Sequence, residues 1–170
     1  MQIYEYYVDY NDKNNNYSLA RNTMSLFNEM KLYNLLEKNS VKVNSKFYAT
    51  KDVWSMLAFE KLLQSEHIEL YDELMKLNKD WLTRIIKYVN PKVIICEGVK
   101  SFSYLDEEIY ADTEGWTEDL KYEENKICGY YRREDGLILF GYSRSPKYFN
   151  NNYIAGHLKP LLLENRTNGK

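Results

Sequence analysis

The sequence predicts an α/β fold with three layers, in which helices cover both faces of a central, mostly parallel sheet. Several stretches carry apolar residues at helical spacing, residues 93–96 form a short β-branched run, and Asp135-Gly136 is a strong hairpin signal. With 170 residues, 44% of them hydrophobic, the chain is long enough for one such domain. We place that domain at 1–165 and a frayed tail at 166–170.

The first half of the chain predicts one strand and three helices. Residues 3–10 are rich in tyrosine and β-branched residues and favour a strand, followed by a polar turn at 11–16. Apolar residues at helical spacing predict a helix over 19–38, with Thr23 on its apolar face, and further helices over 52–64 and 69–89.

The middle of the chain predicts a buried strand followed by a short helix. Pro91 ends the preceding helix, because proline disfavours the helical conformation in the residue before it. Residues 93–96 (Val-Ile-Ile-Cys) show no alternation, which favours a strand covered on both faces within a parallel sheet. A helix over 101–110, capped by Ser101 or Ser103, is expected next.

The last third predicts a hairpin and a final helix. The acidic stretch 112–124 is expected to be an exposed loop. Strands are expected at 127–132 and 137–142, joined by the Asp-Gly turn, and a helix follows over 153–164.

The composition disfavours duplex DNA binding and membrane association. The net charge of −2 disfavours duplex DNA as a partner, since its backbone requires a basic excess. No run approaches the roughly 18 apolar residues of a membrane helix, and no secretory signal is visible, so no membrane association is expected. Cys96 and Cys128 stand apart, with Cys96 predicted to be a small buried side chain, which suits a reducing cytoplasmic location.

No cofactor or metal is predicted. The sequence lacks the glycine-rich loops that hold dinucleotides or nucleoside triphosphates. Its two histidines, His67 and His157, and its two isolated cysteines have no metal-ligand spacing.

In open α/β sheets, ligands bind beyond the carboxyl ends of the strands. Three segments are expected to meet there: 9–17, 97–101 and 141–149. The candidate ligand-binding residues are Asn11, Glu97, Gly98, Tyr142, Ser143, Arg144, Ser145, Lys147, Tyr148 and His157.

These residue types suit an anionic, planar ligand. Arg144 and Lys147 would hold phosphate, and tyrosine rings such as Tyr148 would offer a flat face to a base. A solvated loop is the alternative for this segment. Glu97 would accept a hydrogen bond from a ribose hydroxyl or act as a base, or it would pair with Lys100.

Gly98 and His157 are candidate ligand contacts that could instead have a purely structural role. Gly98 would allow close approach of a ligand, or would only free the turn into the next helix. His157, one turn after Tyr153, would be a ligand contact or a partly buried, hydrogen-bonded side chain.

Residues 78–98 resemble the central segment of the uracil-DNA glycosylase superfamily. The Trp81-Leu82 pair on a helix, followed by Pro91-Lys92-Val93-Ile94 and Gly98, is similar to that family's helix and strand. The resemblance extends over about 70–165 and includes Ser145-Pro146 before the last helix. It implies a glycosylase-like fold with a pocket of nucleobase size.

The chain departs from that family at both catalytic loops. The family's second loop is His-Pro-Ser-Pro, whereas here Ser143 and Arg144 replace the histidine and the first proline. The first loop lacks glycine and proline, and only Asp9, Asn11 or Asp12 would match the family's water-activating residue. A lost histidine removes a group that stabilises the departing base.

Three functions remain open from the sequence. The first is non-catalytic binding of a nucleotide or nucleotide-derived signal, with a phage or defence-related role that would sequester the ligand. The second is an active glycosylase on single-stranded DNA or a nucleotide N-glycosidic hydrolase, with Asp9 or Asp12 as catalytic candidates. The third is a protein-interaction module that uses Trp116 and Tyr122 of the acidic stretch. The oligomeric state is left open.

Overall fold

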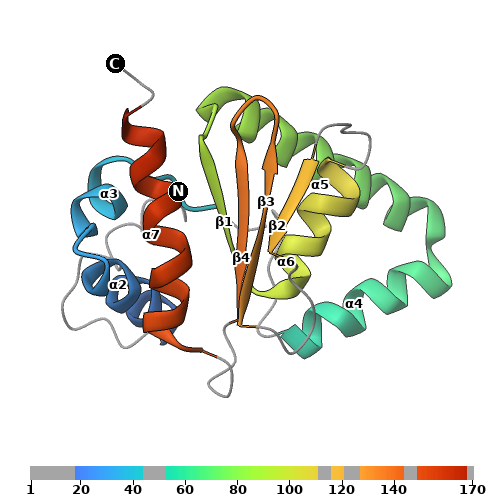
Figure 1. Cartoon of the computed structure of the whole chain (residues 1–170). Coiled ribbons are helices and arrows are strands. Elements are labelled where there is room, and N and C mark those ends of the chain that lie inside the picture. The colour runs from blue at the N-terminus through green and yellow to red at the C-terminus, as the bar shows by residue number, and fades with distance from the viewer. Residues whose placement is uncertain (1–17, 44–52, 111–115, 121–126, 144–148, 168–170) are drawn as a thin grey trace. The chain divides into compact units, whose positions relative to one another are not determined.

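The computed structural model (Figure 1) describes residues 18–43, 53–110, 116–120, 127–143 and 149–167. The chain divides into two compact units. Met1–Val43 and Pro91–Lys170 form the sheet unit, and Asn44–Asn90 form the hairpin unit. The strand predicted over 3–10 lies outside the described residues, and the assignment of 1–165 to one domain stays a prediction.

The sheet unit contains a four-stranded sheet in the order β1-β4-β3-β2. The strands are β1 (Val93–Glu97), β2 (Trp116–Leu120), β3 (Cys128–Arg133) and β4 (Ile138–Tyr142). β1 runs parallel to β4, while β3 is antiparallel to both β4 and β2. The α/β class is confirmed, but for the described strands the prediction of a mostly parallel sheet is wrong. The tight turn between β3 and β4 forces them to run in opposite directions.

The turn between β3 and β4 follows the predicted Asp-Gly signal. Gly136 has a φ of +86°, a conformation that side chains with a Cβ rarely adopt. Asp135 accepts two hydrogen bonds from the Arg133 guanidinium and one from the Leu137 N–H at 3.1 Å. The bond from Arg133 is the main reason that the pKa of Asp135 falls to about 2.

The expectation that the acidic stretch 112–124 is a loop is wrong for its centre. β2 pairs with β3, with Trp116 opposite Arg133 and Thr117 opposite Arg132. Acidic residues in this segment obscured its strand character, yet charged residues are common on edge strands, where they discourage pairing with other chains.

The helix predicted over 19–38 is two helices, α2 (Ser18–Glu29) and α3 (Tyr33–Lys38). Lys31 adopts the left-handed conformation with a φ of +60°. The Leu32 N–H donates to the Phe27 carbonyl and the Lys31 N–H donates to the Asn28 carbonyl, both at 2.9 Å. This pair of bonds is the Schellman helix end, which here forms without the usual glycine.

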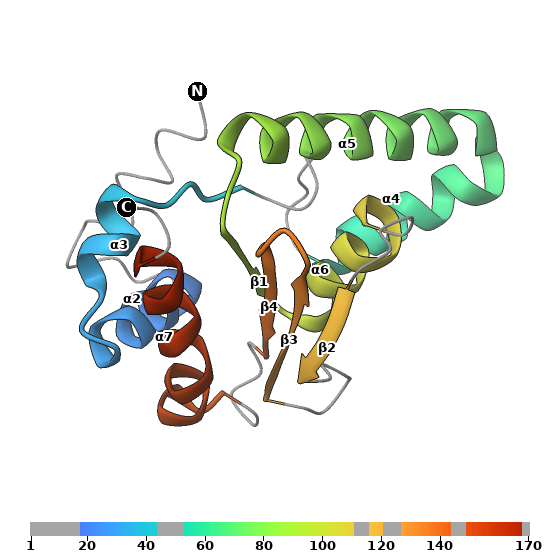
Figure 2. The same cartoon turned by 45° about the horizontal axis from the view of Figure 1, so that its top comes forward.

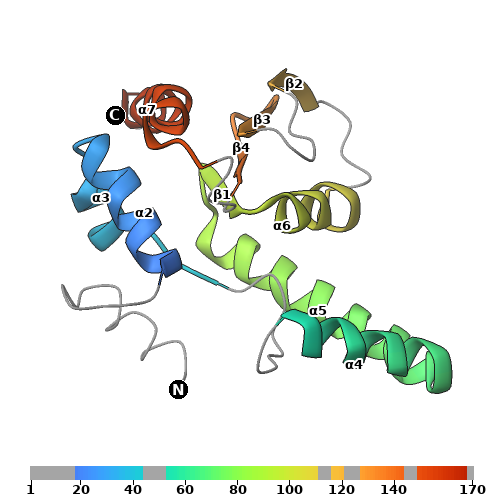
Figure 3. The ribbon, with the colours of Figure 1, turned by 90° about the horizontal axis from the view of Figure 1, so that it is seen from below.

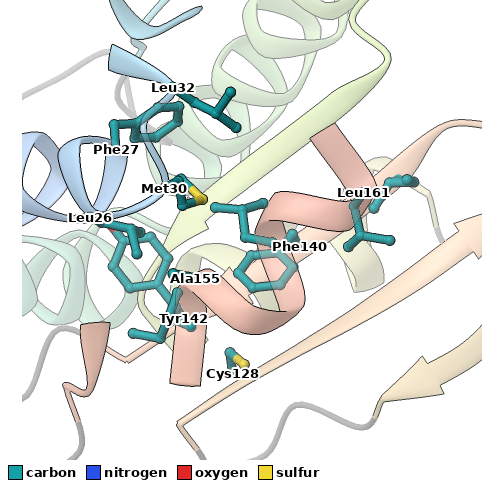
Figure 4. Close-up of a cluster of buried hydrophobic side chains, with 12 residues drawn as sticks. Leu26, Phe27, Met30, Leu32, Cys128, Phe140, Tyr142, Ala155 and Leu161 are labelled. Atoms are coloured by element: carbon teal, nitrogen blue, oxygen red, sulfur yellow. The ribbon is translucent and has the colours of Figure 1, made fainter. Parts of the chain in front are cut away.

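One face of the sheet is covered by α2, α3 and α7 (Asn151–Thr167) (Figure 1). Leu26 of α2 and Met30, which directly follows that helix, pack with Phe140 of β4 and Leu158 of α7, all nearly or fully buried. Figure 4 shows part of this core cluster. Alternation along β4 sends Ile138, Phe140 and Tyr142 to this face.

The opposite face is covered by α6 (Val99–Tyr104) and a π-helical turn, η1 (Leu105–Ile109) (Figure 3). Phe102 is buried and meets the ring of Tyr131 edge-on at 5.1 Å. The predicted caps are wrong, because Ser101 and Ser103 lie inside α6. The helix begins after Gly98, whose φ of +114° favours glycine.

The hairpin unit contains α4 (Val53–Glu66) and α5 (Ile68–Val89), which contact each other and diverge from the turn that joins them (Figure 2). Both helices are confirmed to within about two residues of their predicted bounds. α5 ends at Val89, and the next residue, Asn90, is left-handed and precedes Pro91.

Candidate functional site

The carboxyl ends of the two parallel strands lie at one edge of the sheet. Glu97 of β1 and Tyr142 of β4 are register partners, and the Gly98 N–H donates to the Tyr142 carbonyl at 2.8 Å. This is the edge where open α/β sheets place their ligands. The predicted residues Glu97, Gly98, Tyr142 and Ser143 therefore come together here.

A chain of hydroxyl groups leads from the core to the Glu97 carboxylate. The Thr23 hydroxyl donates to Glu97 Oε1 at 2.6 Å, and the oxygens of Thr23 and Tyr142 are 3.2 Å apart. Because Thr23 has one hydroxyl proton and gives it to the carboxylate, Tyr142 is the donor in the second bond. Thr23 and Tyr142 are both buried, so these bonds satisfy groups that are cut off from water.

Lys42 completes this group of side chains. Its ammonium group is 3.6 Å from Glu97 Oε2, and the Lys42 and Glu97 side chains are 32% and 19% exposed. Both carboxylate oxygens are therefore engaged, at a position that solvent still reaches. We call Thr23, Lys42, Glu97 and Tyr142 the strand-end cluster.

Tyr142 contributes its hydroxyl to this cluster, while its ring belongs to the core. The side chain is 2% exposed, and the ring lies 6.0 Å from the ring of Phe149. Ser143 follows directly, and its N–H donates to the Ile127 carbonyl at 2.8 Å. The structure thus shows the Tyr142 ring face covered by protein.

The remaining candidates lie elsewhere. His157 is on α7, with its ring 4.7 Å from that of Tyr153 on the same helix, so within the described chain it is placed against Tyr153 and not in the strand-end cluster. Seven of the predicted residues lie outside the described residues: Asp9, Asn11, Asp12, Arg144, Ser145, Lys147 and Tyr148.

Two members of the strand-end cluster were not predicted as site residues. Thr23 carried a signal, because it is a hydroxyl residue on an otherwise apolar helix face. Lys42 carried none, since it lies after α3 in an irregular segment and its partner is 55 residues away in sequence. Lys100, the alternative partner for Glu97, is exposed.

Both cysteines are buried free thiols, as predicted for Cys96. Burial raises the pKa of Cys128 to about 12, and burial together with the neighbouring Glu97 raises the pKa of Cys96. Neither thiol is set up as a nucleophile.

Other features of the described residues add no second site. No group of three or more His, Cys, Asp or Glu side chains among them is arranged to hold a metal ion. An open hollow of about 480 Å³ is lined by Met24, Ser25, Asn28 and Glu29. By helical geometry this hollow is on the opposite side of α2 from Thr23.

Comparison with protein-family models, curated proteins and solved structures found no match for this chain. None of the described helices has the length and hydrophobicity to cross a membrane.

Proposed function

We propose that this protein binds a small nucleotide-like ligand at the strand-end cluster without cleaving it. The observation that carries the proposal is the Glu97 carboxylate. It is partly buried at the carboxyl edge of the parallel strand pair and engaged by Thr23 and Lys42.

The chemistry of the cluster suits the sugar or base of a nucleotide. A carboxylate has about four acceptor positions, so Glu97 keeps acceptor capacity for ligand hydroxyl or N–H groups beside its two protein partners. Lys42 adds a cation next to it. In the sequence, Arg144 and Lys147 follow β4 within five residues and would supply further charge for a phosphate.

Non-catalytic binding is favoured over hydrolysis. A hydrolase that releases a base has to stabilise the negative charge that develops on that base. The resemblance to uracil-DNA glycosylases supports the same conclusion, because Ser143 stands where that family has its histidine. We propose that such a protein would sequester a nucleotide or nucleotide-derived signal.

Isothermal titration calorimetry with a panel of nucleoside monophosphates, diphosphates and cyclic nucleotides tests this function. At least one nucleotide should bind the unmodified protein, and Glu97→Gln and Arg144→Ala should each remove the heat of binding. Glu107→Gln changes an exposed carboxylate on η1 and should bind normally.

Failure of every nucleotide to bind, or unchanged affinity of Glu97→Gln, would contradict the proposal. Chromatography of the same mixtures detects free base. Base release that depends on the protein would favour the glycosidase alternative.

A further inference from the structure

α5 carries an exposed apolar stripe along its length. Leu70, Leu77 and Tyr88 are 53%, 52% and 92% exposed. Leu74 and Trp81 lie between them at steps of three or four residues and are half-buried. These spacings place all five side chains on one side of the helix, which we call the α5 stripe.

The buried side of α5 is not the side that carries the α5 stripe. The buried residues of this helix, Asn78 and Leu82, are about 100° around the helix axis from Leu70 and Leu77. Nine of the twelve exposed large hydrophobic residues in the described chain lie on α4 and α5. An apolar surface of this kind is typical of an interaction site.

A row of exposed charges borders the α5 stripe along one flank. Its members also recur every three or four residues, so they share a line on the helix surface. They are Glu69, Glu73, Lys76, Asp80, Arg84 and Lys87. The row begins with two acids and ends with two bases.

We propose that a second copy of this chain docks antiparallel on the α5 stripe. In an antiparallel pair of helices with twofold symmetry, the same flank of each helix meets. With the pair centred near residue 79, Leu70 faces Tyr88 of the second copy and Leu77 faces its Trp81. The same register sets Glu73 one residue from the position opposite Arg84 of the second copy.

The other charges follow this register. Glu69 lies within two residues of the position opposite Lys87, and Lys76 lies within two residues of the position opposite Asp80. All three charged pairs therefore join an acid to a base. Leu70 and Leu77 meet Tyr88 and Trp81, and Leu74 falls opposite Arg84. The same charges can also form pairs within one helix at a spacing of three or four residues. Pairing of that kind leaves the α5 stripe uncovered, whereas a second copy covers it.

Sedimentation equilibrium of the full chain, from micromolar to hundreds of micromolar, tests the proposal. The unmodified protein should show a monomer–dimer equilibrium. Leu77→Asp should weaken dimerisation by about tenfold or more, as for a central interface residue. The control Leu163→Asp alters an exposed leucine on α7 and should leave the dimerisation constant unchanged.

A charge exchange tests the antiparallel register and does not depend on the stripe variants. Glu73→Arg should weaken dimerisation several-fold at low salt, and the double variant Glu73→Arg, Arg84→Glu should restore it. These two positions are eleven residues apart on α5 and do not meet within one helix. A monomer at every concentration, a dimer insensitive to Leu77→Asp, or a double variant as weak as Glu73→Arg would each overturn the proposal. Circular dichroism confirms that each variant is helical.

Discussion

Thr23 is the residue on which the geometry of the strand-end cluster depends most. It faces the sheet from α2, and its hydroxyl lies between the Glu97 carboxylate and the Tyr142 hydroxyl. Removing that hydroxyl would leave the buried Tyr142 group without this acceptor and Glu97 without this donor. Loss of a partner for a buried polar group costs more than the bond itself contributes.

We therefore expect Thr23→Val to lower the free energy of unfolding by about 1–3 kcal/mol, measured by urea denaturation near neutral pH. Thr23→Ser keeps the hydroxyl and should lose only about 1 kcal/mol, for one buried methyl group. Equal stability of the valine and serine variants would mean that the hydroxyl bonds contribute little.

For single residues, the sequence predicted the place of a side chain on its helix or strand better than it predicted which other side chains it contacts. Glu97 and Gly98 could be assigned to the carboxyl end of a strand because they follow a β-branched run, and Thr23 could be assigned to the buried face of its helix. Their meeting depends on how α2 packs on β1, which involves residues 74 apart in sequence. The spacing of apolar residues within one helix or strand does not indicate which distant segment that element packs against.

Among the elements, the β3–β4 hairpin has the clearest local cause. Gly136 sits at a φ of +86°, and a Cβ added there would meet nothing within 4 Å. Any cost of adding a methyl group at this position is therefore a cost of backbone conformation and not of packing. Gly156, inside α7, also has open space for a Cβ but has no such φ.

These two glycines form a matched pair for thermal or urea unfolding. Gly136→Ala should destabilise the protein by about 1 kcal/mol or more, because alanine is strained at a positive φ. Gly156→Ala should stabilise it by roughly 0.5–1 kcal/mol, because alanine loses less conformational freedom in a helix. Effects of the same sign at both positions would contradict this conformational explanation.

The break after α2 and the strand β2 were not predicted, because in both places the local sequence favours a different structure from the one that tertiary contacts stabilise. Lys31 ends α2 in a left-handed conformation, which glycine usually provides, so no residue marked the break. Leu32, just after it, is buried in the core cluster, and this burial favours the turn. In β2, acidic residues concealed a strand whose pairing comes from β3.

At the scale of the whole molecule, burial is uneven between the two units. The sheet unit holds the core cluster and fully buried residues such as Ile138 and Phe140. Among the described residues of the hairpin unit, only Leu63, Asn78 and Leu82 are buried. Regions with few buried apolar contacts open at lower free energy than the core of the protein.

We expect native-state hydrogen exchange to show this difference. At low protein concentration, amides of α5 should exchange faster than those of α7. The two helices are comparable, with 22 and 17 residues, but α7 is anchored by Ile154, Leu158 and Leu161. Protection of α5 equal to that of β4 would show instead that both units unfold together.

The same measurement at rising protein concentration separates the two sources of stability available to α5. Contacts within one chain give protection that does not change with concentration, whereas docking of a second copy adds protection by mass action. Amides along the stripe between Leu70 and Tyr88 should therefore slow as concentration rises, while those of α7 should not. Leu77→Asp should abolish that concentration dependence and leave the exchange of α7 as it is.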